Sequence, residues 1–196
     1  MFFVAFFLFF RFFFRIFMSV IFLHMVVFPP CLVARLGVSS SVVFSGSRSF
    51  SPSVFDPGAL FSLVPSGCSV SVGCASGFDA SVRSFFPFAI VFRARSFGVG
   101  RSSFARRSVA LVASLFGSSA PLVVVVPCAP CPVGLVPSSR SGRCFAGFGS
   151  GSWASASFAV GSGLPCAVWV GAGASVPVGW VGGCVVGGWL FFNFEF

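Results

Sequence analysis

The sequence contains no Lys, Thr, Gln or Tyr, and only one each of Asn, Glu and His. All of these residue types require an adenine in every codon, whereas the abundant Phe, Val, Gly, Ser and Arg can be encoded without one. No principle of folding excludes Thr while accepting Ser, or Lys while accepting Arg. The stop codons also contain adenine, so a message poor in that base stays open by chance. The leading hypothesis is therefore a chance or antisense open reading frame whose product has no assignable biochemical function.

Charged residues are also scarce. Only 8% of the residues are charged, against about 25% in an ordinary soluble domain. A soluble fold needs a charged, solvated exterior, so the composition predicts no defined globular fold. The net charge of +9 comes from 12 arginines set against three acids, and the arginines are thinly spread along the chain.

The scarcity of His and of acids argues against catalysis. A Ser or Cys nucleophile usually needs a His base with an orienting acid, and the sole histidine is His24, inside an apolar leader. Asp56, Asp79 and Glu195 are far apart in the sequence and form no obvious acid–base pair. We therefore predict that the chain is not an enzyme and has no catalytic, cofactor-binding or metal-binding residues.

A long apolar run is what the chain does have, at its N-terminus. Residues 1–34 are built mainly on Phe, and the run between Arg15 and Arg35 is 19 residues without charge, close to the length that crosses a bilayer. Cleavage after Ala34 is disfavoured because Leu32 stands where a small residue is preferred. The leader predicts an uncleaved signal anchor or transmembrane helix, a lipid bilayer as partner and membrane localisation.

The middle region, residues 35–143, is rich in Ser, Val, Pro and Gly. Because Pro and Gly interrupt its short alternating patterns, we predict a mostly irregular, low-complexity and disordered chain. Local patterns indicate a short helix near 103–116 and short strands near 88–92 and 122–126.

The tail, residues 144–196, carries no charge before Glu195. Gly179, Gly183 and Gly187 fall four residues apart, a spacing that lets membrane helices approach closely. The tail therefore predicts a possible second membrane segment and self-association, although Gly is frequent enough here for the spacing to arise by chance.

Two short motifs suggest chemistry. Cys128-Ala-Pro-Cys131 follows a valine-rich strand, as in dithiol redox sites, and it is also half of a zinc site. Such thiols need a following helix, which Pro132 disfavours, so two cysteines in a Pro-rich turn is the preferred interpretation. Gly98-Val-Gly100 is a weak match to a dinucleotide loop. The eight cysteines show no compact disulfide framework.

The densest basic segment spans 93–107, where five arginines alternate with phenylalanines. Arginine with aromatic side chains can bind single-stranded nucleic acid through phosphate contacts and base stacking. Two alternatives to a product without function therefore stay open. One is a small membrane-anchored protein, and the other is a basic module, centred on 93–107, that binds nucleic acid or anionic lipid.

Overall fold

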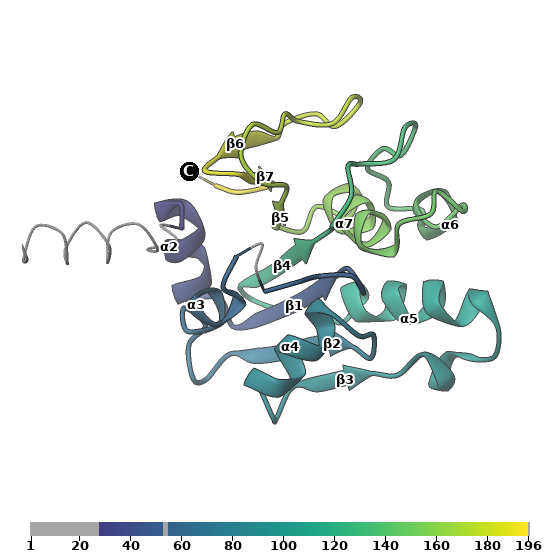
Figure 1. Ribbon diagram of the computed structural model, residues 1–196, viewed down its shortest axis with the longest axis horizontal. Helices are drawn as coiled ribbons and strands as arrows, with labels where there is room; N and C mark the ends of the chain where they lie inside the picture. The colour runs from purple at the N-terminus through teal and green to yellow at the C-terminus, as the bar shows by residue number, and fades with distance from the viewer. Residues whose placement is uncertain (1–27, 53–54, 196) are drawn as a thin grey trace, which may run out of the picture.

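Seven strands make one mixed sheet in the computed structural model, which describes residues 28–52 and 55–195 (Figure 1). The strands are β1 (Ser41–Gly46), β2 (Ser69–Gly73), β3 (Ile90–Phe92), β4 (Pro121–Val126), β5 (Cys166–Trp169), β6 (Cys184–Val186) and β7 (Trp189–Phe192). The helices are α2 (Pro30–Val38), α3 (Pro57–Phe61), α4 (Phe78–Phe85), the 3-10 helix η1 (Ala94–Phe97), α5 (Arg101–Ala113), α6 (Ser141–Cys144) and α7 (Gly151–Gly161).

The sheet has the strand order β3-β2-β1-β4-β5-β7-β6. The first five strands of this order are parallel, and β7 lies antiparallel between β5 and β6. The chain moves outward from β1 to β3, then returns through α5 to β4 on the other side of β1. This reversal makes the β1–β4 boundary the switch point of a doubly wound sheet.

The central strands β1 and β4 carry continuous apolar runs because both of their faces are covered. Val43, Val123 and Val125 pack on one face, whereas Val42 and Val124 pack on the other. All five are fully buried. These runs are therefore the core of a three-layer domain.

The many phenylalanines fill the face covered by α2, α3 and α4. Phe44 of β1 packs against Phe61 and Phe78, with ring centroids 5.4 and 6.2 Å apart. The opposite face is covered by α5 and α7, where Leu111 and Trp153 are buried against the sheet. Aromatic side chains thus contribute a large share of the buried apolar area.

The prediction of no defined globular fold, with a disordered and mostly irregular chain, is wrong. The Pro and Gly residues that seemed to interrupt strands lie mainly at the ends of elements, and short parallel strands buried on both faces lack long alternating patterns. The predicted local elements do occur, as β3 (Ile90–Phe92), α5 (Arg101–Ala113) and β4 (Pro121–Val126). The sequence did not indicate that the two strands belong to one sheet.

The prediction of a transmembrane helix or signal anchor through residue 34 is also wrong. Pro30 begins the helix α2, whose Leu32 and Leu36 are fully buried in the domain core. The uncharged run before Arg35 is therefore shared with a domain helix, and the rest of the leader, 1–27, lies outside the described residues. Within 28–52 and 55–195, no helix combines the length and apolarity that a membrane crossing requires.

The tail likewise contains no membrane segment among its described residues. Residues 144–195 supply α7 and the strands β5, β6 and β7, all of which pack in the same sheet-and-helix domain as the middle region. Gly179 and Gly187 have positive φ angles of 82° and 57°, so they occupy turns and do not share a helix face. The four-residue glycine spacing therefore reflects turns between strands.

Candidate functional site

A cavity of about 700 Å³ opens at the carboxyl ends of β1 and β4, the switch point of the sheet. We call it the polar cavity. Its walls come from five places. They are the segment 45–49 at the end of β1, Ala75 and Asp79 after β2, the first two turns of α5, Cys128 and Ala129 after β4, and the segment 144–154 around the start of α7. In open sheets of this winding, ligands bind in the crevice outside the carboxyl ends of the strands at the switch point.

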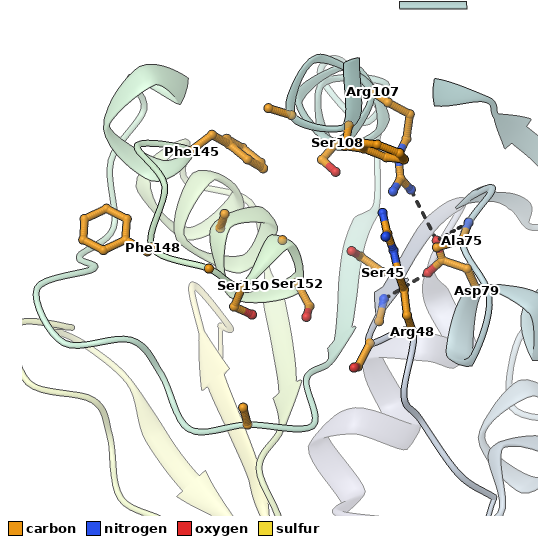
Figure 2. Close-up of a pocket in the computed structure, with 18 of the residues that line it drawn as sticks. Ser45, Arg48, Ala75, Asp79, Arg107, Ser108, Phe145, Phe148, Ser150 and Ser152 are labelled. Carbon is orange, nitrogen blue, oxygen red and sulfur yellow. Dashed lines mark hydrogen bonds and ion pairs between the residues drawn. The ribbon is translucent and has the colours of Figure 1, made fainter. Parts of the chain in front are cut away.

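A buried ion pair supports one side of this cavity (Figure 2). Nη1 of Arg107, on α5, lies 3.3 Å from Oδ2 of Asp79, on α4. Asp79 also accepts the backbone N–H groups of Gly46, at 3.1 Å, and Ala75, at 3.4 Å. One carboxylate therefore ties the loops after β1 and β2 to the helices α4 and α5.

The pair is held away from water. Asp79 is 1% exposed and Arg107 is 7% exposed. Burial raises the pKa of the Asp79 carboxyl, while the Arg107 charge and the two backbone donors oppose that rise. Nε of Arg107 has no hydrogen-bond partner. The carboxylate is thus fully used in holding the site together and is not available to a ligand.

Two glycines allow this close packing. A Cβ at Gly73, the last residue of β2, would overlap the guanidinium of Arg107 and the carboxylate of Asp79. A Cβ at Gly46, the last residue of β1, would overlap the Phe78 side chain. Both strands therefore end in the one residue type that leaves room for the ion pair and its helix.

Free cations face the opening. Arg48 and Arg101 line the cavity and are exposed, and Arg48 lies over the Phe104 ring with its Cζ 4.7 Å from the ring centroid. Among the described residues, neither arginine has a carboxylate within ion-pair distance. The surface of the cavity is therefore electropositive, because its one acid is already paired.

The opposite wall is a glycine-rich loop that leads into α7. Gly147 and Gly149 have φ angles of 95° and 87°, and the Ser150 hydroxyl caps α7 by accepting the backbone N–H of Trp153 at 3.4 Å. Figure 2 shows Ser150 and Ser152 across the cavity from Arg48. The start of α7 thus adds backbone N–H groups and the positive end of a helix dipole to this wall.

The structure separates the residues of the basic segment 93–107. Arg101 and Arg107 line the polar cavity, whereas Arg93, Arg95 and Arg106 do not. Gly98-Val-Gly100, the weak dinucleotide match, follows the edge strand β3 and not the switch-point strand β1. The loop in the position of a phosphate-binding turn is instead the one that begins at Gly46.

Cys128 and Cys131 lie in the segment after β4, and Cys128 is exposed at the cavity. No helix follows Cys131 before α6, and burial raises the pKa of its thiol to about 11. The Cys131 thiol is therefore neutral at neutral pH. All eight cysteines fall within the described residues, and each is a free thiol.

Two candidates considered from the sequence remain, the single histidine and a metal site. His24 lies outside the described residues. In 28–52 and 55–195, no three His, Cys, Asp or Glu side chains gather as metal ligands. Asp79, Arg48 and the loop before α7 were not predicted as site residues from the sequence. Signals for them were present, since Gly46 ends an apolar run and Ser150 precedes a helix of small residues.

No family model matches the chain, and neither a curated protein nor a solved structure matches it.

Proposed function

We propose that the polar cavity binds a phosphate-bearing ligand of the nucleotide class. The observation that carries this proposal is the position of the unpaired cations Arg48 and Arg101 at the switch point of a doubly wound sheet. Sheets wound in this way bind nucleotides at that crevice, with phosphates near a helix N-terminus.

Electrostatics favour an anion. Asp79 is the only acid that lines the cavity, and Arg107 neutralises it. Arg48 and Arg101 therefore add two positive charges with no internal counter-charge. Guanidinium groups form charge-assisted hydrogen bonds with phosphate oxygens, which are stronger than neutral ones. The hydroxyls of Ser47, Ser49 and Ser150 supply further donors along the same walls.

Size and aromatic content favour a nucleotide over inorganic phosphate. The volume of about 700 Å³ falls within the usual range for small-molecule sites. The residues Phe104 and Phe148 are 42% and 36% exposed, and with Phe145 they line the cavity. Exposed aromatic faces bind nucleobases by stacking, which is tolerant of the base identity.

Recognition rests on phosphate and not on ribose. In nucleotide folds an acid past the second strand commonly binds the ribose hydroxyls. Here β2 ends at Gly73 and is followed by Cys74, and Asp79 is committed to its ion pair. ADP is therefore expected to bind and adenosine is expected to bind far more weakly.

Calorimetric titration of the full chain tests this proposal with the phosphate-bearing ligands ADP and NAD and with adenosine, which has no phosphate. The variants Arg48→Gln and Arg101→Gln should each weaken ADP binding by about tenfold, since each removes a charge-assisted contact. Arg95→Gln is the matched control, because Arg95 is exposed and lies outside the cavity. Equal losses in all three variants, or equal affinity for ADP and adenosine, would refute the proposal.

The hypothesis of a chance or antisense reading frame stays a prediction with a separate test. It concerns the base composition of the message, whereas the proposal above concerns what the folded chain binds. Ribosome profiling together with a frame-matched peptide by mass spectrometry tests translation. A long, charged, well-patterned protein encoded on the complementary strand would support the antisense origin.

The remaining expectations also stay predictions. Absence of enzymatic activity, nucleic-acid binding by 93–107 and self-association have not been tested. Contact of the N-terminal segment with a lipid bilayer, and the membrane localisation that follows from it, rest on residues 1–27, outside the described part of the chain. Carbonate extraction of a tagged full chain tests the localisation, because a peripheral protein is released.

A further inference from the structure

A second cavity, of about 900 Å³, lies beside the polar cavity at the carboxyl ends of β4 and β5. We call it the apolar cavity. Its walls are mainly two loops, 127–136 and 170–179, which project from the same edge of the sheet in Figure 1. Cys128 and Ala129 line both cavities. Ligands in the two cavities would therefore lie next to each other.

The two loops are joined to each other. Nε1 of Trp180 donates to the carbonyl oxygen of Leu135 at 2.8 Å, and Gly179 is close enough to Val136 that a Cβ there would lie 2.8 Å from its side chain. Trp180 is only 4% exposed. The gap between the loops is thus held by a buried anchor and is part of the fold.

The lining of the apolar cavity excludes charge. Among the residues that the structure describes, no Arg, Asp or Glu lines it. The polar side-chain groups of its lining are the Ser175 hydroxyl, the thiols of Cys128 and Cys131, and the indole N–H groups of Trp153 and Trp169. A charged ligand there would lose its hydration without gaining a partner, which is strongly unfavourable. The occupant that fits this lining is uncharged.

Aromatic surfaces favour a planar occupant. The indole of Trp169, which is partly exposed, lines the cavity and offers it an aromatic surface. Trp153 also lines the cavity, but it is only 1% exposed. Nε1 of Trp153 donates to the carbonyl oxygen of Ala129 at 2.8 Å, so its polar edge is already satisfied. Val133 and Val178, at the mouth, are each 98% exposed. Aromatic rings attract other rings in offset or edge-to-face geometry, and the exposed valines offer apolar surface that a ligand would cover.

We infer that the apolar cavity is a second ligand site, which takes an uncharged aromatic small molecule beside the phosphate-bearing ligand. The site shares only Cys128 and Ala129 with the polar cavity, so its occupancy does not require the proposed nucleotide. Because the site adjoins the polar cavity, the aromatic group that it binds would be a second substrate or an extension of the first ligand.

Photolabelling of the full chain with the uncharged probe 3-trifluoromethyl-3-phenyldiazirine tests this inference. Cleavage at arginine places the two loops in separate peptides, because Arg140 and Arg143 lie between them. Label is expected in 127–136 and 170–179, both with and without ADP. Val178→Asp should lower labelling of both loops about fivefold, because it puts an unpaired charge at the mouth. Val181→Asp is the matched control, being 89% exposed on the same connection but outside the cavity.

Two results would overturn the inference. One is label that spreads evenly over exposed apolar positions such as Phe88 and Val99, or that falls equally in Val178→Asp and Val181→Asp. The other is a dimer in solution that Val178→Asp dissociates, since a second copy would then fill the cavity. Loss of ADP binding with intact labelling would refute the proposed nucleotide site and leave this one standing.

Discussion

The two cavities share one edge of the sheet and two residues, yet their chemistry is opposite. The polar cavity collects arginines and serines from the end of β1 and from α5, above the buried pair Asp79–Arg107. The apolar cavity is walled by loops of Pro, Gly, Val and Trp that carry no charge. The difference places a charged cavity at the switch point, where a doubly wound sheet binds its ligand. Arg48, Asp79, Arg101 and Arg107 line that cavity, whereas no charged residue in the described part of the chain lines the apolar cavity.

The largest effect is expected from breaking the support of the polar cavity. Asp79→Ala leaves Arg107 buried without a counter-charge and strips two backbone N–H groups of their acceptor, so it should lower the free energy of unfolding by about 3–5 kcal/mol. Urea unfolding followed by tryptophan fluorescence measures this loss. Asp56→Ala is the control, because Asp56 only caps α3 through the Gly58 N–H at 2.8 Å, worth about 1 kcal/mol. Equal losses would show that the pair does not support the site.

A smaller loss of folding stability is expected when an added methyl group crowds the Asp79–Arg107 pair. Gly73→Ala places a Cβ against Arg107 and Asp79, and it should cost about 2 kcal/mol or more by overpacking. Gly37→Ala, on the exposed side of α2 with open space around it, should instead stabilise the helix by up to about 1 kcal/mol. Thermal unfolding of both variants shows whether each substitution lowers or raises the folding stability. A Gly73→Ala protein as stable as wild type would contradict the close packing.

The thiols of Cys166 and Cys131 should make the folding stability fall at alkaline pH. Burial raises the pKa of the Cys166 thiol in β5 and raises that of Cys131 to about 11, so both stay neutral in the folded chain. Because the unfolded thiols ionise near pH 8.5, stability is fully present below that pH and falls as the pH rises toward the folded values.

Between pH 7.5 and 10.5, ionisation of the Cys166 thiol in the unfolded chain alone should lower the free energy of unfolding by about 2.7 kcal/mol. Lys and Tyr, which usually titrate in this range, are absent from the sequence, so the pH dependence comes mainly from thiols. Cys68, Cys144 and Cys184 add to it, because burial raises the pKa of each. Cys166→Ala should reduce the pH dependence while lowering stability at pH 7.5. A stability curve that is flat from pH 7.5 to 10.5 would contradict the burial of these thiols.

The smallest expected effect is a difference in salt dependence between ligand binding in the two cavities. Raising ionic strength from 50 to 200 mM should weaken ADP binding about threefold, because Arg48 and Arg101 are exposed and their attraction is screened. Labelling of the apolar cavity by the uncharged diazirine should not fall over the same range. Parallel titrations at the two salt concentrations check both statements, and an equal salt response in both cavities would remove the distinction between them.

Local pattern predicted part of the fold. The valine run of β4 and the helix α5 could be read from the sequence because each has an uninterrupted pattern of its own. The sheet order could not be read, since the pairing of β1 with β4 joins segments that are about 80 residues apart and is set by packing on both faces. Scarcity of charge also misled the prediction, because Ser and Gly occupy much of the solvated surface of this domain.

The candidate site was less predictable than the fold. From the sequence, Asp79 was weighed only against the other two acids as an acid–base partner. Its ion-pair partner Arg107 is 28 residues away in sequence and meets it only after β2, α4 and α5 have packed. The arginine cluster was recognised, but sequence spacing alone could not tell Arg101, at the cavity, from Arg95, away from it. Which member of such a cluster faces a site depends on the start of a helix, and that boundary is weakly encoded.

Hydrogen–deuterium exchange of the full chain, with and without ADP, tests the central claim most directly, namely that β1 and β4 form the middle of a sheet whose carboxyl edge binds phosphate. The predicted result is slow exchange at 41–46 and 121–126, with additional protection by ADP at 46–49 and 147–152 and none at 170–179. Rapid exchange throughout 35–195, or protection by ADP that avoids the loops at the switch point, would contradict the account.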